Sequence, residues 1–343
     1  MKREKTHISI RDIARTMRLP PMTVSRAIRG GPVEAALKKR ICAKAAAMGY
    51  RKGVFSSFKR PLKNPATVVF ALQRTIGIEI SNDYYFYTPV YFTAARLLTA
   101  RGYQCVLTDI IDEPSLMNVS SGDIFVFSEK LPAFAVPFLS SGSLRRSALV
   151  LQGENPMGTS FKPDLDAMAR MAVHYLVERG HRHVAVYSPL GNTVLGRRAD
   201  AFCQACRKKD AVVDVIDADS GMKDKSAIEL FAKSTKNMPT AIFTTGGFFT
   251  MQAYGFLMRN GYRIPDRIGL LGFDNFGFYE HLEVPLSRLY ADLDAFGSML
   301  AESIIASSGA PMRKKETIIV PVRFEDKGSV LPVDKMRINE VNV

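Results

Sequence analysis

The chain has 343 residues, 47% of them hydrophobic and 23% charged, which is the composition of a soluble globular protein with two or three domains. Its net charge of +14 lies entirely in residues 1–66, where 17 Lys and Arg face three acidic residues; the 30 basic and 30 acidic residues of 67–343 cancel. This asymmetry predicts a polyanionic partner for the N-terminal part alone. Nucleic acid is the first candidate and an anionic membrane surface the second, with a basic tail that serves only solubility as the remaining alternative.

Several classes of protein are not expected. Residues 1–5 contain no apolar run, so we expect no signal peptide. The sequence contains no stretch of about 20 apolar residues, so we expect no membrane span. Cys203 and Cys206 have the spacing of half a zinc site, but no second Cys or His pair follows at zinc spacing. Two thiols on a helix are the favoured interpretation. We expect a cytoplasmic protein without a metal or another cofactor.

The segment 9–50 predicts three short helices around a tight turn. Ser9 is the expected N-cap of the first helix, and Pro21 suits the first turn of the second because that position does not need an N–H. Apolar residues at helical spacing define the buried faces of the helices: Ile10, Ile13, Ala14 and Met17; Val24, Ala27 and Ile28; and Leu37, Ile41, Ala45 and Met48. Two helices joined by a short turn, with a third closing the core, form the helix-turn-helix plan of DNA-binding domains.

The outward side chains of the second helix are the candidate DNA contacts. Arg26 can donate two hydrogen bonds to guanine O6 and N7, with a phosphate contact or a solvated charge as the alternative. Pro21 and Met22 lack useful donors, so they would read DNA shape or a thymine methyl group. Thr23 and Ser25 are expected to bond phosphates, as is the N-terminal end of the helix. Further cations are general phosphate candidates: Lys2, Lys5, Arg11, Arg29 and Lys52.

These residues resemble the lactose/galactose repressor (LacI/GalR) family of bacterial transcription regulators. The similarity runs through Ser9-Ile-Arg-Asp-Ile-Ala-Arg15, Thr23-Val-Ser-Arg-Ala27, Lys39-Arg40-Ile41 and Met48-Gly-Tyr-Arg51. Ser9, Tyr50 and Arg51 complete the expected DNA-binding set within these segments. The resemblance continues over nearly the whole chain and implies a DNA-binding regulator.

Residues 52–66 are predicted to be a basic linker. The family places a short hinge helix here, which folds on DNA and inserts a leucine into the minor groove. This chain departs from that pattern, because Gly53 stands where an Asn is usual and Lys59 where the leucine should be. Phe55 or Phe58 is the candidate replacement for the leucine, and an unstructured linker is the alternative.

From residue 67 onward, short apolar strands alternate with helices. The expected strands are 67–72, 104–109, 123–127, 148–151, 183–188, 212–216, 241–244 and 268–272; the expected helices are 90–102, 165–180, 197–209, 224–234, 249–261 and 292–307. This alternation predicts parallel sheets with helices on both faces. The family resemblance implies two such lobes on the type-I periplasmic-binding-protein plan. Residues 112–122 replace what is normally a helix of several turns.

The domain prediction has four parts: a helix-turn-helix domain at 1–51, a basic hinge or linker at 52–66, a two-lobe effector and dimerisation domain at 67–334, and a C-terminal tail at 335–343. The expected fold is therefore an all-α headpiece followed by an α/β two-lobe domain.

The expected effector cleft departs from the family pattern. Sugar-binding members usually carry an Arg, an Asn-Asp pair and an Asn at places where this chain has Gly196, Gly246-Gly247 and Leu165. The remaining candidates to hold an effector are Phe86, Tyr87, Asp164, Arg197, Arg198, Phe248 and Asp274. Aromatic side chains suit stacking on a sugar face or an apolar effector, with packing in a core or between the lobes as the alternative. Asp274 has a second interpretation, as a loop cap. The loss of hydrogen-bonding groups favours an unusual, more apolar effector or none.

No nucleophile, phosphate-loop or metalloprotease motif occurs, so no enzyme is expected. The favoured interpretation is a homodimeric, sequence-specific DNA-binding regulator, and the family resemblance implies a repressor. It is expected to read a near-palindromic operator and to respond to a small effector, with a sugar-related molecule as one class. A two-lobe solute-binding protein without specific DNA recognition is the alternative.

Overall fold

The computed structural model describes residues 10–29, 33–48, 66–73, 83–140, 146–191, 193–220, 227–235, 237–275, 277–307 and 314–336. Contacts divide the chain into two compact units, Met1–Arg60 and Pro61–Val343. The domain boundaries near 51 and 66 stay predictions, because they fall between the described segments. Ser9, Tyr50, Arg51 and Phe58 also lie outside the described residues, as do the linker except Ala66 and most of the C-terminal tail.

The first unit contains the three predicted helices: α1 (Ile10–Met17), α2 (Pro21–Arg29) and α3 (Ala35–Ala47). Its core is made by two residues from each helix: Ile13, Ala14, Val24, Ala27, Ile41 and Ala45. Full burial of Ile13, Val24 or Ile41 contributes roughly 1.5–3 kcal/mol each. The periodicity of the sequence predicted this core because a helix brings residues three and four apart onto one face.

The first lobe of the second unit is a six-stranded sheet in the order β11-β5-β4-β3-β1-β2. Every pairing in it is parallel. Its strands are β1 (Thr67–Leu72), β2 (Gln104–Asp109), β3 (Ile124–Phe127), β4 (Ser147–Leu151), β5 (Ser160–Pro163) and β11 (Thr317–Val320). Its helices are η1 (Asp83–Tyr87), α5 (Thr88–Thr99), α6 (Glu113–Met117), α7 (Ala135–Ser140) and α12 (Leu293–Ala306). The prediction that 112–122 lacks a long helix is confirmed, since α6 has five residues.

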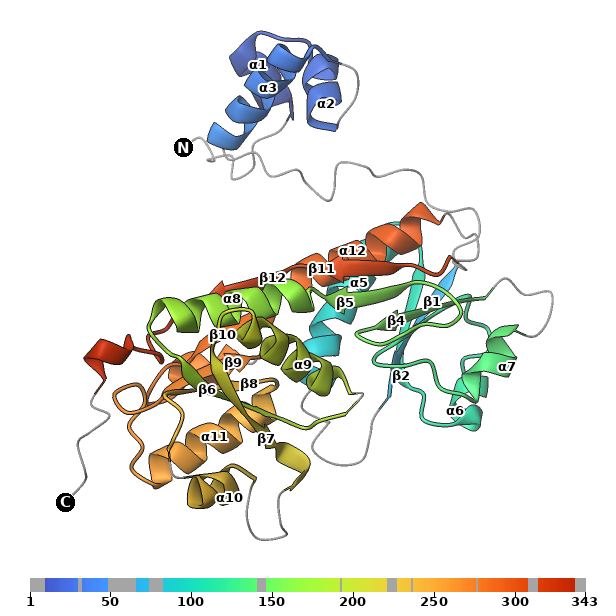
Figure 1. Cartoon of the computed structure of the whole chain (residues 1–343). Coiled ribbons are helices and arrows are strands. Elements are labelled where there is room, and N and C mark those ends of the chain that lie inside the picture. The colour runs from blue at the N-terminus through green and yellow to red at the C-terminus, as the bar shows by residue number, and fades with distance from the viewer. Residues whose placement is uncertain are drawn as a thin grey trace. The chain divides into compact units, whose positions relative to one another are not determined.

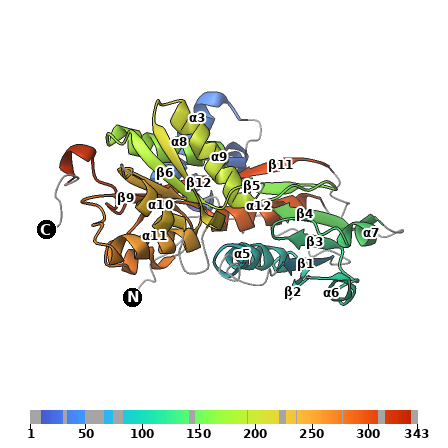
Figure 2. The same cartoon turned by 60° about the horizontal axis from the view of Figure 1, so that its bottom comes forward.

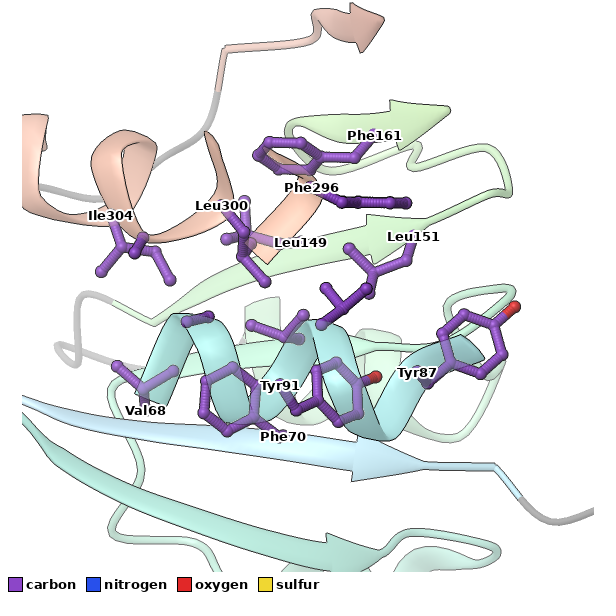
Figure 3. Packing of buried hydrophobic residues seen from close by; sticks show 14 of the residues in the cluster. Val68, Phe70, Tyr87, Tyr91, Leu149, Leu151, Phe161, Phe296, Leu300 and Ile304 are labelled. Carbon is purple, nitrogen blue, oxygen red and sulfur yellow. The ribbon is translucent and has the colours of Figure 1, made fainter. Parts of the chain in front are cut away.

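The core of this lobe lies where α12 and α5 pack on the sheet (Figure 3). Phe70 of β1 stacks on Tyr91 of α5 with ring centroids 4.8 Å apart. Phe161 of β5 stacks on Phe296 of α12 at 6.2 Å. Residues from the two ends of the lobe's sequence therefore share one core, which fixes α12 beside α5.

The second lobe is a six-stranded sheet in the order β12-β10-β9-β8-β6-β7. Only β12 runs antiparallel to its neighbour among these described strands. Its strands are β6 (His183–Ser188), β7 (Val212–Asp217), β8 (Ala241–Thr244), β9 (Gly269–Phe273), β10 (Ser287–Ala291) and β12 (Val322–Glu325). Two clusters of buried residues cover its faces, one with α8 (Leu165–Glu178) and α9 (Val194–Arg207), the other with α10 (Ala227–Ser234) and α11 (Gly247–Arg259). Short helical turns complete the lobe: η2 (Ala218–Ser220), η3 (Gly277–His281) and η4 (Val333–Lys335).

The two lobes lie side by side and are joined by three crossovers (Figures 1 and 2). The chain passes from β5 to α8, from β10 to α12 and from β11 to β12. Asp164 and Asp292 stand at two of these crossings and cap α8 and α12 through Ala167 N (2.8 Å) and Ala295 N (3.0 Å). This confirms the two-lobe α/β plan.

The predicted helices 197–209 and 249–261 begin earlier in the structure than expected. α9 starts at Val194, capped by Thr193, and α11 starts at Gly247. At Gly196 a Cβ would lie 2.2 Å from the carbonyl oxygen of Gly191, so glycine is needed there for close backbone approach. Strands β5, β10, β11 and β12, each of four or five residues, were not predicted. No helix among the described segments combines the length and the hydropathy needed to cross a membrane.

Candidate nucleic-acid interface and interlobe cleft

Helix α2 presents the candidate nucleic-acid interface on the side away from the core of its unit. Val24 and Ala27 are buried, whereas Pro21, Met22 and Arg26 are exposed, Met22 by 66%. Thr23 and Ser25 are half-buried at its edges. Five of the predicted contact residues thus lie on or beside one outward surface of α2. Arg29 belongs to the same helix, but its side chain lies outside the described part of the chain.

The first turn of α2 has an unusual backbone. Pro20 and Pro21 carry no N–H, and the amides of Thr23 and Val24 both donate to the carbonyl of Pro20, at 3.0 and 3.3 Å. A helix N-terminus normally offers its first free N–H groups to phosphate. Side chains around α2 must therefore supply more of any phosphate binding than the prediction assumed. Exposed cations on the three helices and in the turn between α1 and α2 are available for it: Arg15, Arg18, Arg26, Lys39, Arg40 and Lys44.

A cleft of about 650 Å³ lies between the two lobes of the second unit. Five of the seven predicted effector residues line it: Phe86, Arg197, Arg198, Phe248 and Asp274. Tyr87 is fully buried behind the lining, where its hydroxyl donates to Glu129 Oε1 at 3.3 Å. Asp164 is not part of the lining and acts as the N-cap of α8. The volume suits a small metabolite.

Arg198 is the most deeply placed cation of the cleft. Its side chain comes from α9 and is 6% exposed. Nη1 donates to Thr245 O at 2.7 Å, and Nη2 donates to Gln152 Oε1 at 2.8 Å. The guanidinium also lies over the ring of Phe273, 4.3 Å from its centroid. Burial lowers the pKa of Arg198 to about 10, and the negative charge of Asp274 partly opposes this change.

Gln152 links the lobes, and sequence reasoning missed it. It follows β4 with φ 65°, a value that non-glycine residues rarely adopt. Its Nε2 donates to Tyr87 Oη at 2.8 Å, and its main-chain carbonyl accepts from Arg197 Nη2 at 3.2 Å. A polar residue directly after a buried strand was the available signal, because ligands bind at the carboxyl ends of parallel strands.

Asp274 and Asn275 directly follow strand β9 of the second lobe, as Gln152 follows β4 of the first. Asp274 is 8% exposed and accepts a hydrogen bond from Tyr279 Oη at 3.2 Å. Burial, reinforced by the charge of Asp274, holds the pKa of Tyr279 well above its usual value, so this phenol stays a donor. Asn275 donates from Nδ2 to Ala291 O at 2.7 Å. Asp274 therefore both contacts a loop side chain and lines the cleft.

The aromatic residues divide between cleft lining and packing. Phe248 lines the cleft and packs edge-on against Phe249 at 5.4 Å, while Phe249 also packs against Tyr187 of β6 at 5.6 Å. Tyr85 lines the cleft from the first lobe and lies 6.1 Å from Phe278 of the second. Some of these aromatic residues thus line the cleft, as effector stacking requires, and the same residues also pack against one another.

The two neighbouring thiols belong to a core. Cys203 and Cys206 are buried among residues of α8 and α9, and burial raises the pKa of Cys206 to about 12. Within the described ranges, no group of three or more His, Cys, Asp or Glu is arranged to hold a metal ion.

Comparisons with known proteins fit this architecture. Residues 173–330 match the family model of a periplasmic binding protein-like domain. The chain is 22% identical to the probable HTH-type transcriptional repressor ExuR of Bacillus subtilis (strain 168), over 94% of this chain and 98% of that protein. Its fold is similar to that of the lac repressor dimer bound to operator and the anti-inducer ONPF, with a TM-score of 0.62 and 16% identity, covering 95% of this chain and 100% of that one. A LacI family transcriptional regulator from Enterococcus faecium with bound ribose gives a TM-score of 0.64 at 17% identity, covering 78% of this chain and 99% of that one.

Proposed function

We propose that the chain is a DNA-binding transcriptional regulator of the LacI/GalR family, and that it is a dimeric repressor whose operator binding is set by an effector in the interlobe cleft. The similarity to ExuR, a probable transcriptional repressor, supports repression. The similarity to the lac repressor dimer on its operator supports two headpieces on one near-palindromic site, because two-fold symmetry in the protein is mirrored in the DNA.

The outward surface of α2 is the observation that carries the proposal. We propose that Arg26 donates to a guanine edge, that Pro21 and Met22 contact bases by shape or methyl groups, and that Thr23 and Ser25 bond phosphates. Ser9, Arg29, Tyr50, Arg51 and Phe58 complete the proposed DNA-binding set. The localised charge of +14 would supply the salt-dependent part of the affinity.

The effector side of the proposal rests on the cleft. Phe86, Arg197, Arg198, Phe248 and Asp274 line it, and Tyr87 stands behind it. A ligand there would favour one relative position of the lobes over another, which is how a ligand shifts a two-state equilibrium. The bound ribose in the Enterococcus faecium regulator supports a small sugar-related molecule as one possible class. We place this activity in the cytoplasm, where bacterial DNA lies, and assign the chain no catalysis, in line with its regulator relatives.

The proposal is tested by selecting duplexes from a random pool with the full chain and measuring affinity by fluorescence anisotropy across salt concentrations. We expect an enriched sequence with two-fold symmetry, and an affinity that falls steeply with salt. Equal affinity for every duplex would rule out specific recognition and favour the solute-binding alternative. A chain lacking residues 1–60 should lose DNA binding, and analytical ultracentrifugation should show two chains per selected duplex.

A further inference from the structure

The floor of the interlobe cleft holds a buried cation, Arg198, for which the described residues provide no salt bridge. Within the described part of the chain, both hydrogen-bond acceptors of Arg198 are neutral, the carbonyl of Thr245 and the side-chain oxygen of Gln152. The negative charges of Asp274 and Glu129 favour its charged form, but neither carboxylate hydrogen-bonds to it. Its Nε is buried and has no partner among the described residues. A buried charge is costly unless it is paired, so this guanidinium is suited to an anion that enters the cleft.

An acceptor without a donor lies on the same lining. Asn275 Oδ1 is buried and receives no hydrogen bond from the described residues. Its orientation is determined, because Nδ2 donates to Ala291 O at 2.7 Å and a flipped amide would set two carbonyl oxygens against each other. A ligand hydroxyl is the kind of donor that this oxygen lacks.

Both of these unpartnered atoms belong to residues of the cleft lining. Three buried side-chain atoms lack a hydrogen-bond partner in the described structure, and two of them, Arg198 Nε and Asn275 Oδ1, belong to residues that line this cleft. Buried polar atoms of native proteins are nearly always satisfied, and exceptions call for an explanation such as a ligand. A ligand that satisfies both atoms needs an anionic acceptor for Arg198 and a neutral hydrogen-bond donor for Asn275.

The rim of the cleft limits the ligand's charge. Three acids, Glu129, Glu154 and Asp219, and one lysine, Lys130, line its exposed edge, so the acids outnumber the lysine there. A second carboxylate on the ligand would meet these acids, whereas a single carboxylate can reach the deeper guanidinium. The rings of Phe86 and Phe248 contribute apolar surface for a carbon skeleton.

We propose that the cleft binds a small hydroxylated monocarboxylic acid, with its carboxylate at Arg198 and a hydroxyl donating to Asn275. This inference rests on the proposed function in taking the cleft as the effector site. It also revises the expectation of a more apolar effector or none. That expectation came from the missing family residues, whereas Gln152 and Asn275 supply polar groups at other positions of the lining.

The test compares matched acids and alcohols by thermal unfolding of the full chain. The probes are gluconate with glucitol, glycerate with glycerol, and glucuronate with glucose, each pair at equal concentration. We expect at least one acid to raise the Tm by about 3–5 °C at a concentration about tenfold above its Kd, while its neutral counterpart does not. Arg198→Gln should abolish the shift, and Arg207→Gln, an exposed position on the same helix, should retain it.

The outcomes separate clearly. A shift by a neutral member equal to that of its acid, no shift with any acid, or a shift that survives Arg198→Gln would overturn the proposal. If Arg198→Gln does not fold, the comparison of each acid with its neutral counterpart on the wild-type chain still tests the proposal. In addition, Asn275→Ala should weaken the binding of the hydroxylated acid about tenfold. DNA binding is measured separately without any acid. Specific DNA binding together with a preference for the neutral sugars would refute this inference alone, and binding of an acid without specific DNA recognition would refute the proposed function alone.

Discussion

Arg198 Nη2 and Gln152 Oε1 lie 2.8 Å apart, although Arg198 belongs to α9 of the second lobe and Gln152 follows β4 of the first. The contact continues from Gln152 Nε2 to the hydroxyl of Tyr87 at 2.8 Å. Arg197 adds a bond to the main-chain carbonyl of Gln152 at 3.2 Å. One glutamine thus connects two arginines of one lobe with a buried tyrosine of the other, so the relative position of the lobes depends on it.

Replacing this glutamine should therefore loosen the lobes. Gln152→Ala leaves the guanidinium of Arg198 and the hydroxyl of Tyr87 without a shared partner, and we expect the free energy of unfolding to fall by about 1–3 kcal/mol. Urea unfolding of the full chain measures this loss. Gln204→Ala changes an exposed glutamine of α9 and should have little effect. Equal stability of the two variants would show that the bridge contributes nothing.

Arg26 should set the preference for one base pair. Arg26→Ala is expected to weaken binding to the selected duplex by about 1–3 kcal/mol and to remove discrimination at a single position. Anisotropy titrations against single-base-pair variants of the duplex measure both effects. Arg40→Ala, an exposed cation of α3, should instead weaken all duplexes alike. An unchanged base preference in Arg26→Ala would assign Arg26 to the phosphates.

The turn between α1 and α2 should become more stable with glycine. Arg18 has φ 52° in that turn, a conformation that costs an L-residue roughly 1–2 kcal/mol. Arg18→Gly should stabilise the headpiece by about 1 kcal/mol, whereas Arg18→Ala keeps the strain and gains nothing. Native-state hydrogen exchange of the amides in α1 and α2 of the full chain distinguishes the two variants. Equal protection factors in both would argue against strain at this residue.

Asp326 should make the second lobe sensitive to acid. Its carboxylate accepts from Tyr175 Oη (2.7 Å), Ser287 Oγ (2.9 Å) and Arg179 Nη2 (2.9 Å). Burial raises the pKa of Asp326, but these bonds outweigh that effect and the pKa lies below its usual value of 3.8. Because the pKa of the folded state is the lower one, the stabilisation is complete above about pH 4 and disappears as the pH falls below it.

Asp326→Asn should consequently be less stable than the wild type at neutral pH, with a gap that narrows toward about pH 3. Thermal unfolding across this range measures the gap. The exposed Asp200→Asn on α9 serves as the control and should follow the wild type at each pH. A gap that stays constant with pH would mean that the carboxylate's charge is not what stabilises the cluster.

Much of the fold was predictable because it depends on neighbours in sequence. The spacing of Ile13, Val24 and Ile41 with their companions predicted all three headpiece helices. The apolar runs of β1, β2, β6 and β8 predicted those strands with the bounds that the structure has. The misplaced start of α9 has the opposite cause, since Gly196 is required by a backbone contact with Gly191 that local propensity does not encode.

The candidate DNA-binding surface could also be predicted from the sequence, whereas the arrangement of the cleft could not. Residue order and helical periodicity by themselves placed Met22 and Arg26 on the outward surface of α2, because one helix determines which of its residues share a face. Only the tertiary structure brought Gln152 to Arg198, removed Asp164 from the cleft lining, and left Asn275 Oδ1 and Arg198 Nε buried without partners. The physical reason is that hydrogen bonding and desolvation in the cleft depend on strand ends from two lobes, which meet only after both sheets have formed and the three crossovers have set them side by side.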